Sequence, residues 1–289
     1  MASYCYILQP NLSIRNKVQN QLGADKEIKA LTSRLLVQSW RRPSMIITGI
    51  LQPLLWLILF GALFQNAPIG LFTSTDTYSD FIGGGIIVFT AFTGALNAGL
   101  PIIFDREFGF LNRLLSSPMY SRYSIVYSSS VNIALTSLVQ VSIIIYVSFL
   151  MGNAIPSTIN GAYIGCTLLL LSNSVTNLSL ILAFILPGHV ELLASLVIIN
   201  LPFLFSSTAL APLIFMPSWL QIIASLNPLS YIIEIIRYTY SHELINYNDC
   251  IMQTVWGPLN MIQITAIMIC INCLSIKLVD MLITKRFEE

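Results

Sequence analysis

A segment of twenty residues gathers charged side chains in a chain that has few of them elsewhere. The segment reads FDREFGFLNRLLSSPMYSRY, positions 104–123, while only 9% of the whole chain is charged. Its charged residues are Asp105, Arg106, Glu107, Arg113 and Arg122. Charges of both signs at this density can pair with a complementary surface and fix the orientation of a bound partner. The chemistry indicated is that of a docking surface.

The spacing of residues 104–115 predicts one amphipathic helix. One face carries four apolar side chains, Phe104, Phe108, Leu111 and Leu115. At about 100° per residue, Arg106 and Arg113 lie on the opposite face, as is typical of a helix on a membrane surface. Phe110 falls nearer the arginines, and an aromatic ring there favours a protein partner whose pocket encloses it. A plain surface anchor is the alternative, and the residues alone leave both open.

The composition places this segment in a membrane protein. Hydrophobic residues make up 55% of the chain and the mean hydropathy is +0.77, whereas about a quarter of the residues in soluble domains are charged. Runs long enough to cross about 30 Å of hydrocarbon predict an all-α fold with six transmembrane helices, near residues 44–64, 80–104, 126–151, 161–186, 193–215 and 257–279. Pro202, Pro212 and Pro217 interrupt the fifth. The net charge of +1 gives no reason to expect nucleic acid as a partner.

The basic residues predict the orientation of the spans. All Lys and Arg except Arg237 lie in the N-terminal segment, in the loop after the second span, or at the C-terminal end. Cytoplasmic flanks carry an excess of such residues, so both termini and the 104–123 segment are expected on the cytoplasmic side or its equivalent. The chain divides into a cytoplasmic segment, residues 1–43, and a transmembrane domain, residues 44–289. Residues 25–40 predict an amphipathic surface helix, which is an anchor or a functional element.

The predicted spans have no ionisable residues in their interiors. Ion-coupled pumps keep such groups in the membrane, so a self-contained pump is disfavoured. A membrane-embedded transferase or hydrolase is disfavoured too, because its catalytic carboxylates or Ser, His and Asp set have no candidates. Cys270 and Cys273 have C-x-x-C spacing, but no second pair or nearby His completes a metal site. We therefore expect no catalytic residue, metal or cofactor bound by this chain.

The polar residues inside the spans are amides and hydroxyls. Asn173 and Asn177 lie four apart and share one face of the fourth span. Hydrogen bonds between helices are the favoured interpretation, and the lining of a substrate path is the alternative. Gly83, Gly84 and Gly85 in the second span predict a close approach of another helix.

The break of the fifth span predicts a hairpin on the outer side. Pro212, Pro217 and Pro228 leave two short apolar-faced helices at residues 218–226 and 229–240. Interrupted backbone at membrane depth is tolerated where it is buried in protein or lines a cavity, so a re-entrant hairpin near an exit fits; a solvated helix pair is the alternative. Glu234 and Arg237 lie three apart on one helix face and are expected to pair.

Two motifs resemble those of a known family. DREFGFLNRLLSSP resembles the (D/E)RExGxLxxLxxxP loop of type-2 ATP-binding-cassette exporter permeases, the ABC-2 family. MPSWLQIIASLNPLSYIIEIIR, positions 216–237, resembles the family's C-terminal signature. The matching positions of that signature are Pro217, Asn227, Pro228, Tyr231 and Arg237, and Glu234 lies among them. The likeness covers residues 25–285. Within this family, the sequence is similar in particular to the plastid-encoded permeases of red algae.

The resemblance implies a permease subunit that is driven by a partner ATPase. The coupling helix, which sits in a cleft of that ATPase, would include Arg106, Glu107, Phe108, Gly109, Phe110 and Arg113. The interface helix would include Arg34, Arg41 and Arg42. Two copies of the permease would assemble with two nucleotide-binding subunits that hold ATP and Mg²⁺, because this chain has no G-x-x-x-x-G-K-[ST] loop.

Location and direction follow from the same resemblance. A multi-pass protein of a plastid membrane is expected, or otherwise of a bacterial inner membrane, in contact with membrane lipid and with both termini on the stromal or cytoplasmic side. Export is the expected direction. A passive channel or a membrane interaction protein is the competing class, and the coupling loop distinguishes them because a channel does not need one. No charged or aromatic groove in the spans indicates which substrate is carried.

Overall fold

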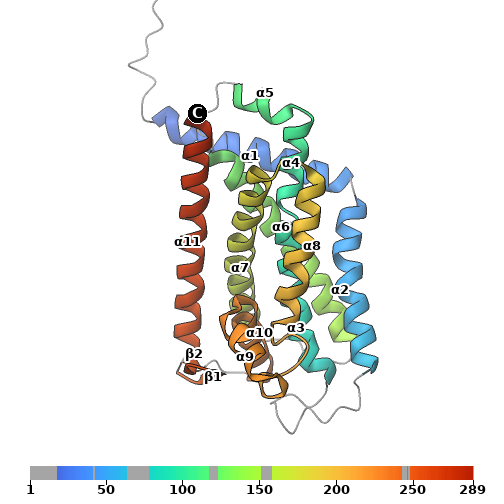
Figure 1. The fold of residues 1–289 in the computed structure, drawn as a ribbon. Helices are drawn as coiled ribbons and strands as arrows, with labels where there is room; N and C mark the ends of the chain where they lie inside the picture. The colour runs from blue at the N-terminus through green and yellow to red at the C-terminus, as the bar shows by residue number, and fades with distance from the viewer. Residues whose placement is uncertain are drawn as a thin grey trace, which may run out of the picture.

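The computed structural model describes residues 18–41, 43–63, 78–116, 123–150, 158–242, 246 and 248–288. The chain forms a bundle of long helices, with one helix lying across an end (Figure 1). The helices are α1 (Val18–Arg41), α2 (Pro43–Leu63), α3 (Tyr78–Leu96), α4 (Gly99–Glu107), α5 (Phe110–Ser116), α6 (Tyr123–Leu150), α7 (Thr158–Ile185), α8 (His189–Phe205), α9 (Ser218–Leu226), α10 (Pro228–Ser241) and α11 (Met261–Glu288). α1, α5 and the end of α11 lie at one end of the bundle, called here the α1 end. α9 and α10 lie at the other, called the hairpin end (Figure 1).

Four of the described helical segments are long and apolar enough to cross a membrane. They are Phe81–Glu107, Tyr123–Leu150, Ile159–Ile185 and Met261–Leu282. The apolar segments Gly49–Leu63 and His189–Phe205 are shorter, and α9 with α10 passes the same test as a pair bent by 83°. A mostly helical, polytopic membrane protein is thereby confirmed, and the count of six spans stays a prediction.

A helix overlaps each of the six predicted spans, but the boundaries of the fifth and sixth are wrong. The sequence predicts the fifth at 193–215, whereas α8 runs from His189 to Phe205. Pro202 lies in the last turn of α8, where it removes a backbone donor and crowds the preceding turn. The helix therefore ends early, and the chain from Ser206 to Pro217 is irregular apart from one 3₁₀ turn at Leu213–Phe215.

A short β-hairpin precedes the last helix, a detail that the prediction of an all-α fold does not include. β1 (Cys250–Thr254) pairs antiparallel with β2 (Gly257–Asn260). Gly257 adopts a φ of +133°, which glycine tolerates at the turn between the strands. The hairpin occupies the first residues of the predicted sixth span, so α11 begins at Met261 instead of residue 257.

Helix α3 lies at the centre of the hydrophobic core. All side chains from Phe81 to Thr93 are buried, and the surrounding cluster contains residues of α2, α6, α7, α8, α10 and α11. The predicted close approach of a helix is confirmed at Gly84, which faces α10, whereas Gly85 faces the irregular chain after α8. A Cβ atom on Gly84 would lie 3.2 Å from Cγ of Arg237, and one on Gly85 would lie 2.7 Å from the carbonyl oxygen of Ala209.

Replacing Gly85 by alanine is expected to lower the free energy of unfolding by about 1 to 3 kcal/mol, because the added methyl group overpacks the site. The backbone of Ala209 would have to move, since its Cα also lies 2.8 Å from the new Cβ. Gly165→Ala in α7 is the matched control, because nothing lies within 4 Å of its Cβ position. Thermal unfolding of the purified variants measures the difference. Equal unfolding temperatures for the two variants would contradict the close approach.

The predicted single helix over residues 104–115 is wrong, because the chain breaks after Glu107. α4 ends there and α5 begins at Phe110. Gly109 has a φ of +73°, the left-handed conformation with which glycine ends many helices. Its N–H donates to the carbonyl oxygen of Arg106, and the N–H of Phe108 donates to that of Phe104. The helical wheel therefore does not extend across this position.

Candidate functional site

The predicted interface helix and coupling segment are joined at the α1 end. Arg34 of α1 donates two hydrogen bonds to the carboxylate of Asp105 in α4, at 2.6 and 2.7 Å. The Arg34 guanidinium carbon also lies 3.9 Å from the centroid of the Phe110 ring. A bidentate pair holds both partners in a fixed orientation better than a single contact does. α1, α4 and α5 therefore present one continuous surface.

The break at Gly109 changes which aromatic side chains this surface exposes. Phe108 is 78% exposed and stacks on Phe104 with ring centroids 6.3 Å apart, whereas Phe110 is 37% exposed beneath Arg34. Leu111 is buried, as its place in the predicted apolar stripe requires. Phe104 and Phe108 are neighbours, as the predicted stripe has them, but the break at Gly109 separates them from the turn that carries Leu111.

Arg106 and Glu107 contact the corner between α7 and α8. Arg106 donates to the carbonyl oxygens of Ala183 and Phe184 in the last turn of α7. It also donates to those of Leu186 and Pro187, which follow α7. Glu107 accepts from the backbone N–H of His189 at 2.7 Å. The two residues lie 82 positions apart, so no local pattern in the sequence predicts this contact.

The other predicted residues of the α1 end are exposed or lie outside the described part. Arg113 in α5 and Arg41 in the last turn of α1 are exposed to solvent. Trp40 beside Arg41 is 85% exposed. Arg42 lies outside the described residues. The exposed side chains of Trp40, Arg41 and Arg113 therefore give this end basic and aromatic groups on its surface.

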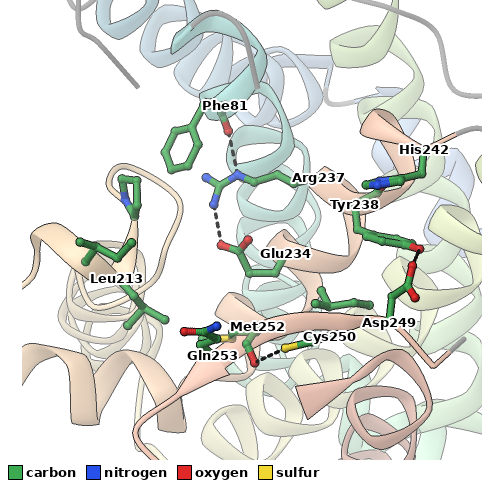
Figure 2. A pocket seen from close by; sticks show the side chains of 13 residues that line it. Phe81, Leu213, Glu234, Arg237, Tyr238, His242, Asp249, Cys250, Met252 and Gln253 are labelled. Atoms are coloured by element: carbon green, nitrogen blue, oxygen red, sulfur yellow. Dashed lines mark hydrogen bonds and ion pairs between the residues drawn. The ribbon is translucent and has the colours of Figure 1, made fainter. Parts of the chain in front are cut away.

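Arg237 is the central residue of the hairpin end. Its side chain is 6% exposed, and its NH1 group donates to Glu234 at 2.7 Å, which confirms the predicted pair. Its Nε donates to the carbonyl oxygen of Phe81 at 3.0 Å and its NH2 to that of Thr208 at 2.7 Å. Figure 2 shows this group at the wall of a cavity of about 680 Å³. The guanidinium thereby fastens α10 to the start of α3 and to the chain after α8.

The remaining signature residues hold the bend between α9 and α10. The side chain of Asn227 accepts from the N–H of Leu229 at 3.0 Å, as an N-cap of α10. It also donates to the carbonyl oxygen of Phe203 at 2.7 Å. Tyr231 donates to the carbonyl oxygen of Ser225. Pro217 immediately precedes α9 and Pro228 is the first residue of α10, a position that proline favours.

Asn173 and Asn177 join α7 to α11. Asn173 donates to the side chain of Asn272 at 3.2 Å, and Asn177 donates to the hydroxyl of Ser275 at 3.0 Å. The favoured interpretation, hydrogen bonding between helices, is thereby confirmed. The same two residues border a cavity of about 420 Å³ with Tyr127 of α6. Their role in a substrate path stays a prediction.

The described residues offer no metal centre. Across the ranges given above, no three His, Cys, Asp or Glu side chains converge as ligands. Cys270 and Cys273 both lie on the exposed surface of α11. The contacts at the two ends of the bundle join helices to one another.

Comparison with known proteins relates this architecture to a family. The model of the ABC-2 type transporter family matches residues 26–240, a range that includes the α4–α5 segment and the α9–α10 hairpin except its last residue. Three curated relatives carry the name "Putative transport permease ycf38". The protein of Pyropia yezoensis is 54% identical over 88% of both chains, and that of Cyanophora paradoxa is 49% identical over 84% of both.

The match to the third relative covers a slightly larger share of the chain. The protein of Porphyra purpurea is 52% identical over 91% of this chain and 90% of its own. Similarity at this level over nearly the whole length assigns a transport permease, a membrane subunit without enzymatic activity of its own. The chain belongs to the ABC-2 type transporter family.

Proposed function

We propose that this chain is the membrane-spanning permease of an ATP-driven exporter, and that a separate nucleotide-binding subunit docks at the α1 end. The observation that carries the proposal is the surface that the Arg34–Asp105 pair holds together. It presents Phe108, 78% exposed, beside the exposed Arg113 of α5. An exposed aromatic anchor with flanking charges is typical of a protein docking surface. The family implies an ABC ATPase as the partner in general.

The partner subunit binds and hydrolyses ATP. ATP and Mg²⁺ are held by the nucleotide-binding subunit, and this chain converts its closure into a change between two packings of the helices. The residues Arg106, Glu107, Phe108, Gly109, Phe110 and Arg113 form the coupling segment, and Arg34, Arg41 and Arg42 belong to the interface helix. The hairpin at the opposite end stands near the exit of the path.

Two copies of the chain form the working permease, in a plastid membrane. The exposed apolar side chains of α2 and α8, such as Leu59 and Val197, face either lipid or the second copy. The plastid location rests on the similarity to algal relatives. A passive channel is the competing function. A channel needs no ATPase, so it does not account for the exposed aromatic surface at the α1 end.

Purification of the native complex tests this function. The permease, isolated from its own membrane in mild detergent, is expected to copurify with a nucleotide-binding protein in equal numbers. Native mass spectrometry is expected to find two copies of each chain and to identify lipid or substrate bound with them. A permease that purifies without any nucleotide-binding protein, under conditions where its own dimer survives, contradicts ATP-driven transport.

The orientation of the bundle gives a second expected result. Cys250 is exposed at the hairpin end, so it is expected to react with a membrane-impermeant thiol reagent added from the outer side. Ser116→Cys, at the exposed end of α5, is expected to react only after the membrane is opened, in a chain that lacks the native cysteines. The opposite pattern contradicts termini on the stromal or cytoplasmic side.

A further inference from the structure

Arg106 caps the C-terminal end of α7. Its NH1 donates to the carbonyl oxygens of Ala183 at 3.0 Å and Phe184 at 3.3 Å. Its NH2 donates to those of Leu186 and Pro187, the latter at 2.8 Å. The last carbonyls of a helix have no partner within it, and they carry the negative end of the helix dipole. A guanidinium is therefore well suited to hold this end.

Glu107, the next residue, caps the start of α8. Its Oε1 accepts from the backbone N–H of His189 at 2.7 Å, and its Oε2 lies 2.7 Å from Nδ1 of the His189 ring. The His189 ring also packs against Phe104, with ring centroids 5.3 Å apart. A carboxylate is favoured at the positive end of a helix dipole. Adjacent residues of α4 thus bind the two helix ends that meet at the α7–α8 corner.

The segment formed by α3 and α4 is also connected to the end of α8 at the hairpin end. Arg237 of α10 donates to the carbonyl oxygen of Phe81, at the start of α3, and to those of Thr208 and Ala209, just after α8. Gly84 makes room for the Arg237 side chain. α3 and α4 together form the apolar segment Phe81–Glu107. This segment is therefore joined to α8 near both of its ends, by charged hydrogen-bonding groups.

We propose that α3, α4, α8 and α10 move together as one rigid unit, called here the lever. Arg106 and Glu107 connect α4 to the start of α8 at the α1 end, and this connection is called here the joint. A displacement of α5 by the ATPase subunit passes through Gly109 to α4. The paired caps then carry it to α8, and Arg237 carries it to the α9–α10 hairpin. This inference rests on the proposed function. It assigns Arg106 and Glu107 to positioning α8, instead of to contact with the ATPase.

Directional contacts are what such a joint needs. Hydrogen bonds to charged groups are shorter and stronger than neutral ones, so they hold the two helix ends in a fixed geometry relative to α4. Many exposed side chains of α8 are apolar, for example Val197 and Ile198. Without the two caps, the ATPase would hold α5 but would have no directional hold on the start of α8.

Hydrogen exchange in the complete complex tests the lever. The permease with its copurifying ATPase subunit, in lipid nanodiscs, is compared without nucleotide and with MgATP plus orthovanadate. In the native complex, nucleotide is expected to change amide exchange both in residues 104–116 and in the hairpin, residues 218–241. In Arg106→Ala/Glu107→Ala, the change in residues 104–116 is expected to persist. The change in the hairpin is expected to shrink about fivefold or more, within the usual range of coupling factors.

Two further variants make the result specific. Glu191→Gln removes a carboxylate from the first turn of α8. Among the described contacts, this carboxylate makes no hydrogen bond to α4, so the variant is expected to respond like the native complex. Glu107→Gln keeps the shape of the side chain and serves where the double variant fails to fold; it is expected to weaken the hairpin response alone.

Three outcomes overturn the lever. An undiminished hairpin response in the Glu107 variants shows that α8 moves without the caps. Loss of the ATPase subunit from those variants shows that Arg106 and Glu107 act as docking residues. A hairpin response that weakens equally in Glu191→Gln shows a general effect of charge at α8. A native complex with no nucleotide response in residues 104–116 contradicts the proposed function itself, and so is distinguished from failure of the joint.

Discussion

Arg237→Ala is expected to lower the free energy of unfolding by about 3 to 5 kcal/mol, because it removes a buried guanidinium that pairs with the half-buried Glu234 and with buried backbone carbonyls. The guanidinium is 6% exposed and satisfies Glu234 together with three backbone carbonyl oxygens, those of Phe81, Thr208 and Ala209. The truncated side chain leaves all of these groups without that donor. Thermal unfolding of the purified protein in detergent measures the loss.

The controls separate charge from geometry at this position. Arg237→Lys keeps the charge but cannot present donors in a fork, so an intermediate loss is expected. Glu234→Gln leaves the three carbonyl contacts in place and is expected to cost less than Arg237→Ala. If Arg237→Ala unfolds at the same temperature as Glu234→Gln, the backbone contacts of Arg237 do not stabilise the fold.

Phe108→Ala is expected to weaken binding of the ATPase subunit by about 2 to 4 kcal/mol, the size of an interface hot spot. That corresponds to about 30- to 700-fold in Kd. The ring is 78% exposed beside Gly109, so its removal leaves the core of the permease intact. Binding of the purified ATPase subunit to the permease in nanodiscs measures the change.

Two other phenylalanines serve as controls. Phe110→Ala is expected to have a smaller effect, because Arg34 covers that ring. Phe205→Ala removes a ring that is 54% exposed at the far end of α8, and it is expected to bind the ATPase normally. If only Phe110→Ala weakens binding, the anchor is the one that the sequence indicates and Phe108 faces lipid head groups.

The helices of the bundle could be predicted because composition and periodicity act locally. An apolar run has to be helical where lipid offers its backbone no hydrogen bonds, and α2, α6 and α7 lie close to the predicted ranges. The Glu234–Arg237 pair is also local, at a spacing that a helix brings together. The break at Gly109 was missed because the helical wheel takes one conformation for every residue, whereas glycine can end a helix.

The contacts of Arg106 and Glu107 could not be predicted in the same way. Their partners are mostly backbone atoms at the α7–α8 corner, 77 to 82 positions away. A backbone carbonyl or N–H is present at almost every residue, so no residue type marks it as a partner. The β-hairpin at residues 250–260 was missed because its strands are only five and four residues long and lack a regular alternation of buried and exposed side chains.

Photo-crosslinking from the two ends of the bundle tests the central claim most directly. A photoreactive phenylalanine analogue is placed at position 108 in one chain and at position 256 in another, where Trp256 is 63% exposed at the hairpin end. Irradiation of the native complex is expected to join the chain modified at position 108, and not the one modified at position 256, to the nucleotide-binding subunit. Crosslinks from position 256 alone, or none from position 108 in an intact complex, contradict docking of the ATPase at the α1 end.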